Sequence, residues 1–256
     1  RIDPDELASC VGCGLCLPYC PTWRVTAEET RSPRGRIAAM RTVAEGSAPL
    51  DATFTRLMDE CVQCRGCEAA CPSGVAFGHL MEGARETLAE ESGYQPWWKR
   101  AAYGVLGRHR LLLAGSSALA LAQRLGLVPR SLGLPERLPV RRAPLVASGD
   151  DVYLFPGCVM DAWMRDTHRA AQRVVEATGA GVAFPAPVGC CGALHVHAGL
   201  AAGARRVAGE VIRSMPGDRP ILVDSAGCGA ASDHYGRLPG ADEAHACSAP
   251  ARDGHA

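Results

Sequence analysis

The stretch CVGCGLCLPYCP at residues 10–21 decides how the first part of this chain folds. Its spacing, C-x2-C-x2-C-x3-C-P, is carried by Cys10, Cys13, Cys16 and Cys20. The stretch CVQCRGCEAACP at residues 61–72 repeats the spacing with Cys61, Cys64, Cys67 and Cys71. Three thiolates two residues apart can hold three corners of one [4Fe–4S] cube, whereas the fourth cysteine, before proline, binds the other cube. The repeat predicts a duplicated domain with two clusters.

The two ligand sets are therefore expected to be crossed. Cluster 1 takes Cys10, Cys13, Cys16 and Cys71, and cluster 2 takes Cys61, Cys64, Cys67 and Cys20. Gly12, Gly14 and Gly66 are expected to let backbone amides approach the cluster sulfides. Zinc is the alternative, but tetrahedral zinc sites use two separated cysteine pairs. Two neighbouring clusters favour a role in stepwise electron transfer.

The composition limits the other function classes. The chain has 256 residues, of which 13 are cysteine, and its formal net charge is zero, so nothing indicates a nucleic-acid partner. Many cysteines indicate either a secreted disulfide framework or metal ligands in a reducing compartment. The first twenty residues hold charges and four cysteines instead of the apolar core of a signal peptide, so a cytoplasmic location is expected. The chain begins at Arg1, which suggests a fragment of a longer product.

The second half of the chain alternates strand-like and helix-like segments. The apolar runs DVYLFPG (151–157), AGVAFPA (180–186) and PILVDSAG (220–227) predict buried strands. Helical spacing is expected from Met160 to Thr178 and from Gly199 to Met215. This alternation predicts a short parallel α/β sheet, in which functional groups follow the carboxyl ends of the strands.

A second group of cysteines follows these strands and is a possible third metal site. Its members are Cys158, Cys190, Cys191 and Cys228. Two adjacent thiolates can both reach a metal or a substrate thiol when strand ends converge. The alternative is a buried set of free thiols. His195 and His197 follow the CCG turn and are interpreted as surface histidines, with proton transfer or donation to sulfur as the alternative. Cys247 has no local partner and is interpreted as incidental.

A basic segment separates the two halves. Residues 97–142 contain nine Lys or Arg and one acid, Glu136, which gives +8 there and −8 in the remainder. Either a solvated helical face or docking to an acidic partner or an anionic membrane surface explains this charge. Residues 111–128 are apolar but interrupted by Gln123 and Arg124, and they barely reach the ~20 residues that a bilayer requires, so a core or interfacial helix is expected. Arg31, Arg34 and Arg36 in RSPRGR (31–36) lie between the two motifs and fit a loop or a docking site equally.

No dinucleotide-binding, P-loop or nucleophile-elbow motif occurs in the sequence. The chain is therefore not expected to bind its own nucleotide or flavin, and no catalytic residue is assigned. Two-electron chemistry would belong to a partner.

Taken together, these motifs resemble the iron–sulfur subunit of bacterial glycolate oxidase, and more widely the lactate-utilisation and anaerobic glycerol-3-phosphate dehydrogenase subunits. The similarity rests on CVGCGLCLPYCPTW, SPRGRI, CVQCRGCEAACPSGV, FPGC, CCGALH and SAGCGA. The resemblance implies an α+β chain of two domains: an all-α ferredoxin-like domain at 1–95, then, after a basic helical linker at 96–150, an α/β cysteine-rich (CCG) domain at 151–256. Family members carry a second CCG domain, which this sequence lacks.

The resemblance also implies the function. FAD-bearing subunits oxidise a 2-hydroxy acid, and electrons pass through the two clusters towards a quinone or membrane acceptor, at the inner face of the cell membrane. Heterodisulfide reductase relatives have a fifth cysteine in the CCG unit, where this chain has Ala231. A thiol or disulfide reductase acting through the CCG cysteines is the alternative function, and a zinc-stabilised interaction module is a third.

Overall fold

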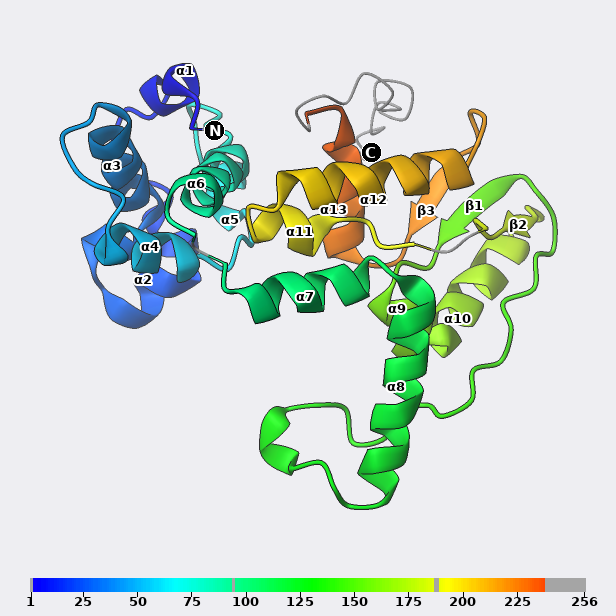
Figure 1. Cartoon of the computed structure of the whole chain (residues 1–256). Coiled ribbons are helices and arrows are strands. Elements are labelled where there is room, and N and C mark those ends of the chain that lie inside the picture. The colour runs from blue at the N-terminus through cyan, green and yellow to red at the C-terminus, as the bar shows by residue number, and fades with distance from the viewer. Residues whose placement is uncertain (1, 94, 187–188, 238–256) are drawn as a thin grey trace. The chain divides into compact units, whose positions relative to one another are not determined.

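Short helices surround the two cysteine motifs in the computed structural model of the chain (Figure 1), which describes residues 2–93, 95–186 and 189–237. The chain divides into two compact units. Unit 1 consists of residues 1–97 and 195–200, and unit 2 of residues 98–194 and 201–256.

Unit 1 is helical in its described residues, as predicted for the ferredoxin-like part. Its elements are α1 (Pro4–Ala8), η1 (Leu17–Tyr19), α2 (Pro21–Thr26), η2 (Glu29–Arg31), α3 (Pro33–Ala44), α4 (Ala52–Asp59), α5 (Gly66–Ala69) and α6 (Phe77–Glu91). Helix α3 begins where Ser32 accepts a hydrogen bond from the Gly35 backbone N–H at 3.0 Å, with Pro33 at the first helical position. Asp51 caps α4 in the same way, through the Phe54 N–H. The start of each helix is thus encoded locally.

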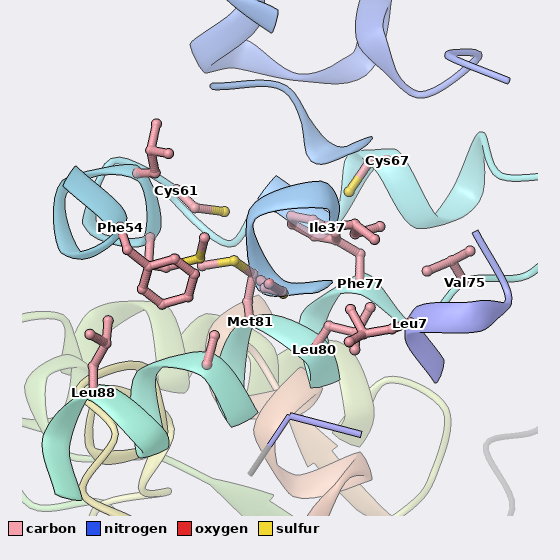
Figure 2. Packing of buried hydrophobic residues seen from close by; sticks show 14 residues of the cluster. Leu7, Ile37, Phe54, Cys61, Cys67, Val75, Phe77, Leu80, Met81 and Leu88 are labelled. Carbon is pink, nitrogen blue, oxygen red and sulfur yellow. The ribbon is translucent and has the colours of Figure 1, made fainter. Parts of the chain in front are cut away.

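The core of unit 1 lies between α3, α4 and α6. Phe54, Leu80, Met81 and Leu88 are all buried there. Cys61 and Cys67 belong to the same cluster, and Figure 2 shows them among its apolar side chains. Two predicted ligands of cluster 2 are therefore fixed by core packing.

Unit 2 contains the expected parallel sheet, with strand order β2-β1-β3. Its strands are β1 (Val152–Phe155), β2 (Val182–Ala183) and β3 (Ile221–Val223), and both β2 and β3 pair parallel to β1. The helices are α7 (Trp97–Leu106), α8 (His109–Arg124), α9 (Val159–Trp163), α10 (Arg165–Glu176), α11 (Ala193–His197, which runs into unit 1), α12 (Ala201–Ser214) and α13 (Ala226–Asp233), with η3 (Arg130–Leu132) and η4 (Tyr235–Arg237). The predicted fold class is confirmed.

Two details of unit 2 differ from the sequence-based expectation. Strand β3 is not buried, because Ile221 and Leu222 at its edge of the sheet are 38% and 40% exposed. The helix expected from Met160 to Thr178 is broken at Met164, whose backbone (φ −132°, ψ 34°) is not helical. The carboxylate of Asp161 pairs with the Arg165 guanidinium across this break.

Within the basic segment, α8 and the chain that follows it pack against α9 in unit 2. The Trp163 indole N–H donates to the Ser116 hydroxyl at 2.9 Å, and Arg142 donates to Ser117 and to the Ala162 carbonyl. Asp161 is fully buried and pairs with His109 at 3.0 Å. Among the residues that the structure describes, no helix is long and apolar enough to cross a membrane.

Candidate metal centres

The eight predicted cluster ligands surround two cavities in unit 1. The first cavity is lined by Cys10, Cys13, Cys16 and Cys71, together with Cys67. The second is lined by Cys20, Cys61, Cys64 and Cys67. Each cavity thus includes all four members of one crossed set, and the first cavity also includes Cys67 of the other set.

The two cavities are neighbours. Pro33, Cys67 and Phe77 line both of them. A single layer of side chains therefore separates the two spaces. This closeness follows from the crossed arrangement, because each motif contributes to both cavities.

The turns between the ligands have the same backbone shape in both motifs. Gly12 and Gly14 have left-handed φ angles of +71° and +83° in the first motif. Gln63 and Arg65 hold the equivalent positions of the second motif with φ of +51° and +56°. Few residues other than glycine adopt this conformation. The sequence analysis considered only glycines at these turns and did not identify Gln63 and Arg65. Aligning the two motifs identifies both positions.

The protonation of the ligand thiols depends on burial. Burial raises the pKa of Cys16 and of Cys61, and it raises the pKa of Cys67 to about 12. Burial acts in the same direction on Cys20, but the Thr22 hydroxyl, the Trp23 backbone N–H and the Arg36 charge together lower the pKa of that thiol. Most of these sulfurs are therefore neutral without iron, and iron binding must release protons.

Each motif leaves one ligand at the surface. Cys13 and Cys64 are exposed, whereas Cys20, Cys61 and Cys67 are buried. The donor set suits iron–sulfur clusters, because each cavity offers four sulfurs within a largely apolar wall. Within the described ranges, no three His, Cys, Asp or Glu side chains form a site for a single metal ion.

Two arginines of the RSPRGR segment reach the two cavities. Arg34 lines the first cavity and donates to the Gly12 carbonyl at 2.9 Å, and it pairs with Glu29, which lowers the pKa of that carboxyl group. Arg36 lines the second cavity. The segment therefore lines the cavities from the end of η2 and the first turn of α3, and is not a loop.

The second cysteine group gathers at the carboxyl ends of the strands in unit 2. The Cys190 sulfur is in hydrogen-bond contact with Cys158 and Cys191, and Cys191 is in contact with Cys228. Shared hydrogens and burial raise the pKa of Cys158 and of Cys191. The contact with Cys191 lowers the pKa of Cys228.

Glycines allow this approach of the four sulfurs. A Cβ atom on Gly157, whose φ is +64°, would lie 3.3 Å from the Cys228 sulfur. At Gly192, with φ of +84°, it would lie 2.9 Å from Val207. The Tyr235 hydroxyl donates to the Cys191 carbonyl at 2.8 Å and holds the turn against the core. Cys247 lies outside the described residues.

The histidines after the CCG turn are not both surface residues. His195 is only 3% exposed, which corrects the expectation for it. The His197 carbonyl accepts from Arg85 at 2.9 Å within unit 1. Burial, with Arg85 and Arg65 nearby, lowers the pKa of His197 to about 4, so that its imidazole is neutral at neutral pH.

Two family models match the segments of the chain that hold the two groups of cysteines. The family model for a 4Fe-4S dicluster domain matches residues 6–75, and the model for a cysteine-rich domain (CCG) matches residues 152–231. The chain therefore contains a 4Fe-4S dicluster domain. It is 33% identical to the probable glycolate oxidase iron-sulfur subunit of Bacillus subtilis over 93% of its own length and 61% of that relative's. Against the glycolate oxidase iron-sulfur subunit of Escherichia coli the identity is 30%, over 91% and 59% of the two lengths.

A more distant relative also covers most of this chain. The relative is one subunit of the dihydromethanophenazine:CoB--CoM heterodisulfide reductase of Methanosarcina barkeri, and it is 24% identical over 87% of this chain and 56% of its own length. The chain thus spans about three fifths of the length of these three curated relatives. No solved structure gives a significant match. The resemblance to glycolate oxidase iron–sulfur subunits is confirmed.

Proposed function

We propose that this chain is the electron-transfer subunit of a complex of the glycolate oxidase type, which oxidises a 2-hydroxy acid. The observation that carries the proposal is the pair of neighbouring cavities, each lined by one crossed set of four cysteines. When bound, two [4Fe–4S] clusters supply carriers that accept and release one electron at a time. The cysteines hold the clusters, and the apolar walls keep water from them.

The surroundings of the cavities suit contact with redox partners. Val11 lines the first cavity and is 73% exposed, whereas Tyr19 and Val62 line the second and are 60% and 66% exposed. Exposed apolar side chains beside a carrier favour small, transient encounters, which are typical of electron-transfer complexes. We infer an FAD-binding oxidase subunit at one cavity and a quinone or membrane acceptor beyond the other. Lactate and glycerol-3-phosphate dehydrogenases are the alternative complexes.

A cytoplasmic location, peripheral to the membrane, belongs to the same proposal. It is supported by the +8 charge of residues 97–142 together with the exposure of Trp97 and Trp98 on α7. Basic residues beside exposed aromatic rings are attracted to anionic membrane surfaces.

Iron analysis of single variants tests the cluster assignment. After anaerobic preparation, the chain is expected to contain about eight iron and eight sulfide, as two [4Fe–4S] clusters require. Cys71→Ala is expected to lose the cluster held with Cys10, and Cys20→Ala the cluster held with Cys61, each leaving half of the iron. Cys158→Ser should leave both unit 1 clusters in place, because that sulfur belongs to unit 2. A colourless, zinc-containing protein would contradict the proposal, as would loss of the same cluster in both variants.

Co-purification tests the partner assignment. Isolation of the native complex should yield an FAD-containing subunit, and reduction of its flavin by glycolate should bleach the cluster absorbance of this chain. Bleaching by lactate or glycerol 3-phosphate alone would assign the chain to one of the alternative complexes.

A second candidate function rests on the four sulfurs of unit 2. Because contacts link the four sulfurs in the order Cys158, Cys190, Cys191 and Cys228, the group suits either a third cluster, or thiol and disulfide chemistry of the heterodisulfide reductase kind. Cys191→Ser separates the candidates. Retained flavin-to-acceptor electron flow speaks against an essential role for this group, whereas lost activity with both unit 1 clusters intact favours it.

A further inference from the structure

Arg36 is a fully buried cation beside the second cavity. It has no exposed surface, and its Nε donates to the Leu57 carbonyl at 2.7 Å. Its Nη1 donates to the Arg31 carbonyl at 2.6 Å, and both Nη atoms lie within 3.4 Å of the Thr22 hydroxyl. All of these oxygens are neutral. In the described part of the chain, no carboxylate forms an ion pair with Arg36.

The remaining contact of Arg36 is with a predicted cluster ligand. Its Nη1 lies 3.9 Å from the Cys20 sulfur, at the limit for a hydrogen bond to sulfur. The guanidinium carries a positive charge at this short distance from the sulfur, so it stabilises negative charge there. A buried charge is costly unless an opposite charge lies nearby. The ligand sulfurs are the groups that can supply it here.

Arg85 is a second buried cation on the same side. It is 6% exposed, and its Nη2 donates to the Met58 and Cys61 carbonyls, each at 2.7 Å. Arg85 thus places a second positive charge beside the backbone of a predicted ligand of cluster 2. Two guanidinium groups without carboxylate partners among the described residues therefore face the second set of ligands.

The arginines beside the first cavity are less buried than Arg36, and one of them is paired with a carboxylate. The guanidinium of Arg34 is 35% exposed and is neutralised by Glu29 at 2.5 Å. Arg41 donates to the Cys10 carbonyl at 2.7 Å, but its side chain is only partly buried. Water and a carboxylate therefore weaken the positive field on this side, whereas neither lies against Arg36.

We propose that Arg36 raises the reduction potential of cluster 2 above the value that its buried ligands alone would give. The inference rests on the proposed cluster assignment. A [4Fe–4S] cluster with four thiolates is negatively charged, and reduction adds one electron without making or breaking a bond. Net charge and hydrogen bonds to the sulfurs set the potential of such a cluster. The fixed guanidinium favours the reduced form, while the burial of Cys20, Cys61 and Cys67 opposes it.

Potentiometric titration of the full chain, followed by electron paramagnetic resonance, tests the proposal. The signal that persists in Cys71→Ala belongs to cluster 2. Arg36→Gln is expected to lower the potential of that signal by about 59 mV or more, which is a tenfold change in the one-electron equilibrium constant. Arg36→Lys, which keeps the charge, should lower the potential of cluster 2 by less. Arg34→Gln is the matched control and should leave cluster 2 unchanged.

The outcomes distinguish this inference from the cluster assignment itself. Absence of two clusters from the wild-type chain would overturn the assignment. Two intact clusters with equal shifts in both, or with the same shift in Arg36→Gln and Arg36→Lys, would overturn only the role of Arg36. Should Arg36→Gln not load iron, pulsed resonance on the wild-type chain labelled with ¹⁵N-arginine decides. Coupling of an arginine nitrogen to the cluster 2 signal supports the contact, and its absence overturns it.

Discussion

Gly12 and Gln63 hold the same place in the two cysteine motifs and adopt the same left-handed backbone, with φ of +71° and +51°. One motif reaches this shape with glycine and the other with a residue that rarely adopts it. The shape of the turn is therefore imposed by the arrangement of the ligands rather than by the local residue type.

Alanine at the two glycines of the first motif should have unequal effects. Gly12→Ala pays only the left-handed backbone cost, about 1 kcal/mol, because nothing lies within 4 Å of its Cβ position. Gly14→Ala should cost more, because its Cβ would lie 2.6 Å from Arg34 Nη1. Loss of cluster absorbance in a denaturant titration measures both. Equal midpoints would show that the Arg34 contact does not constrain the turn.

Alkylation should report which sulfurs bind iron. Cys13 and Cys64 are exposed, so iodoacetamide should modify them quickly once iron has been removed by a chelator. In the loaded protein both should be protected, because a thiolate bound to iron is not free to react. Peptide mass spectrometry gives the extent at each cysteine. Rapid modification of either residue in the loaded protein would remove it from the ligand set.

The buried carboxylate of Asp161 should stabilise unit 2. It has no exposed surface and pairs with His109 at 3.0 Å and with Arg165 at 2.8 Å. Asp161→Asn leaves these partners uncompensated and should lower the free energy of unfolding by about 3 kcal/mol, measured by tryptophan fluorescence in denaturant. Asp166→Asn, whose side chain is fully exposed on α10, should change it by less than about 0.5 kcal/mol.

The same carboxylate predicts a pH dependence. Burial tends to raise the pKa of Asp161, but hydrogen bonds from His109 and Arg165 outweigh burial and lower it below 3.8. A folded-state pKa below the unfolded one gives stability that is present above about pH 4 and lost as the pH falls through the folded-state pKa. The stability of wild-type unit 2 should therefore fall more steeply in acid than that of Asp161→Asn. Parallel curves for the two proteins would contradict this origin.

The stability of unit 2 should depend on the contact between one buried histidine and one carboxylate. His168 is fully buried, and its Nδ1 lies 2.5 Å from Asp224 Oδ2, at the end of β3. Asp224→Ala should cost about 2 kcal/mol, because it leaves the ring nitrogen without its partner. Asp224→Asn should cost less, since its amide oxygen still accepts a hydrogen bond. If the two variants unfold at the same denaturant concentration, the pair does not stabilise unit 2.

The repeated motif and the parallel sheet could be predicted from the sequence, and so could the crossed assignment, which stays a prediction. These follow from spacing and periodicity, which are local properties of the chain. Tertiary structure decided what depends on neighbours distant in sequence. It placed Arg36 against Cys20 without a carboxylate among the described residues, buried His195, and left β3 at the exposed edge of the sheet. Local sequence patterns do not encode which charged side chains become buried next to one another, because this depends on how segments that are distant in the sequence pack.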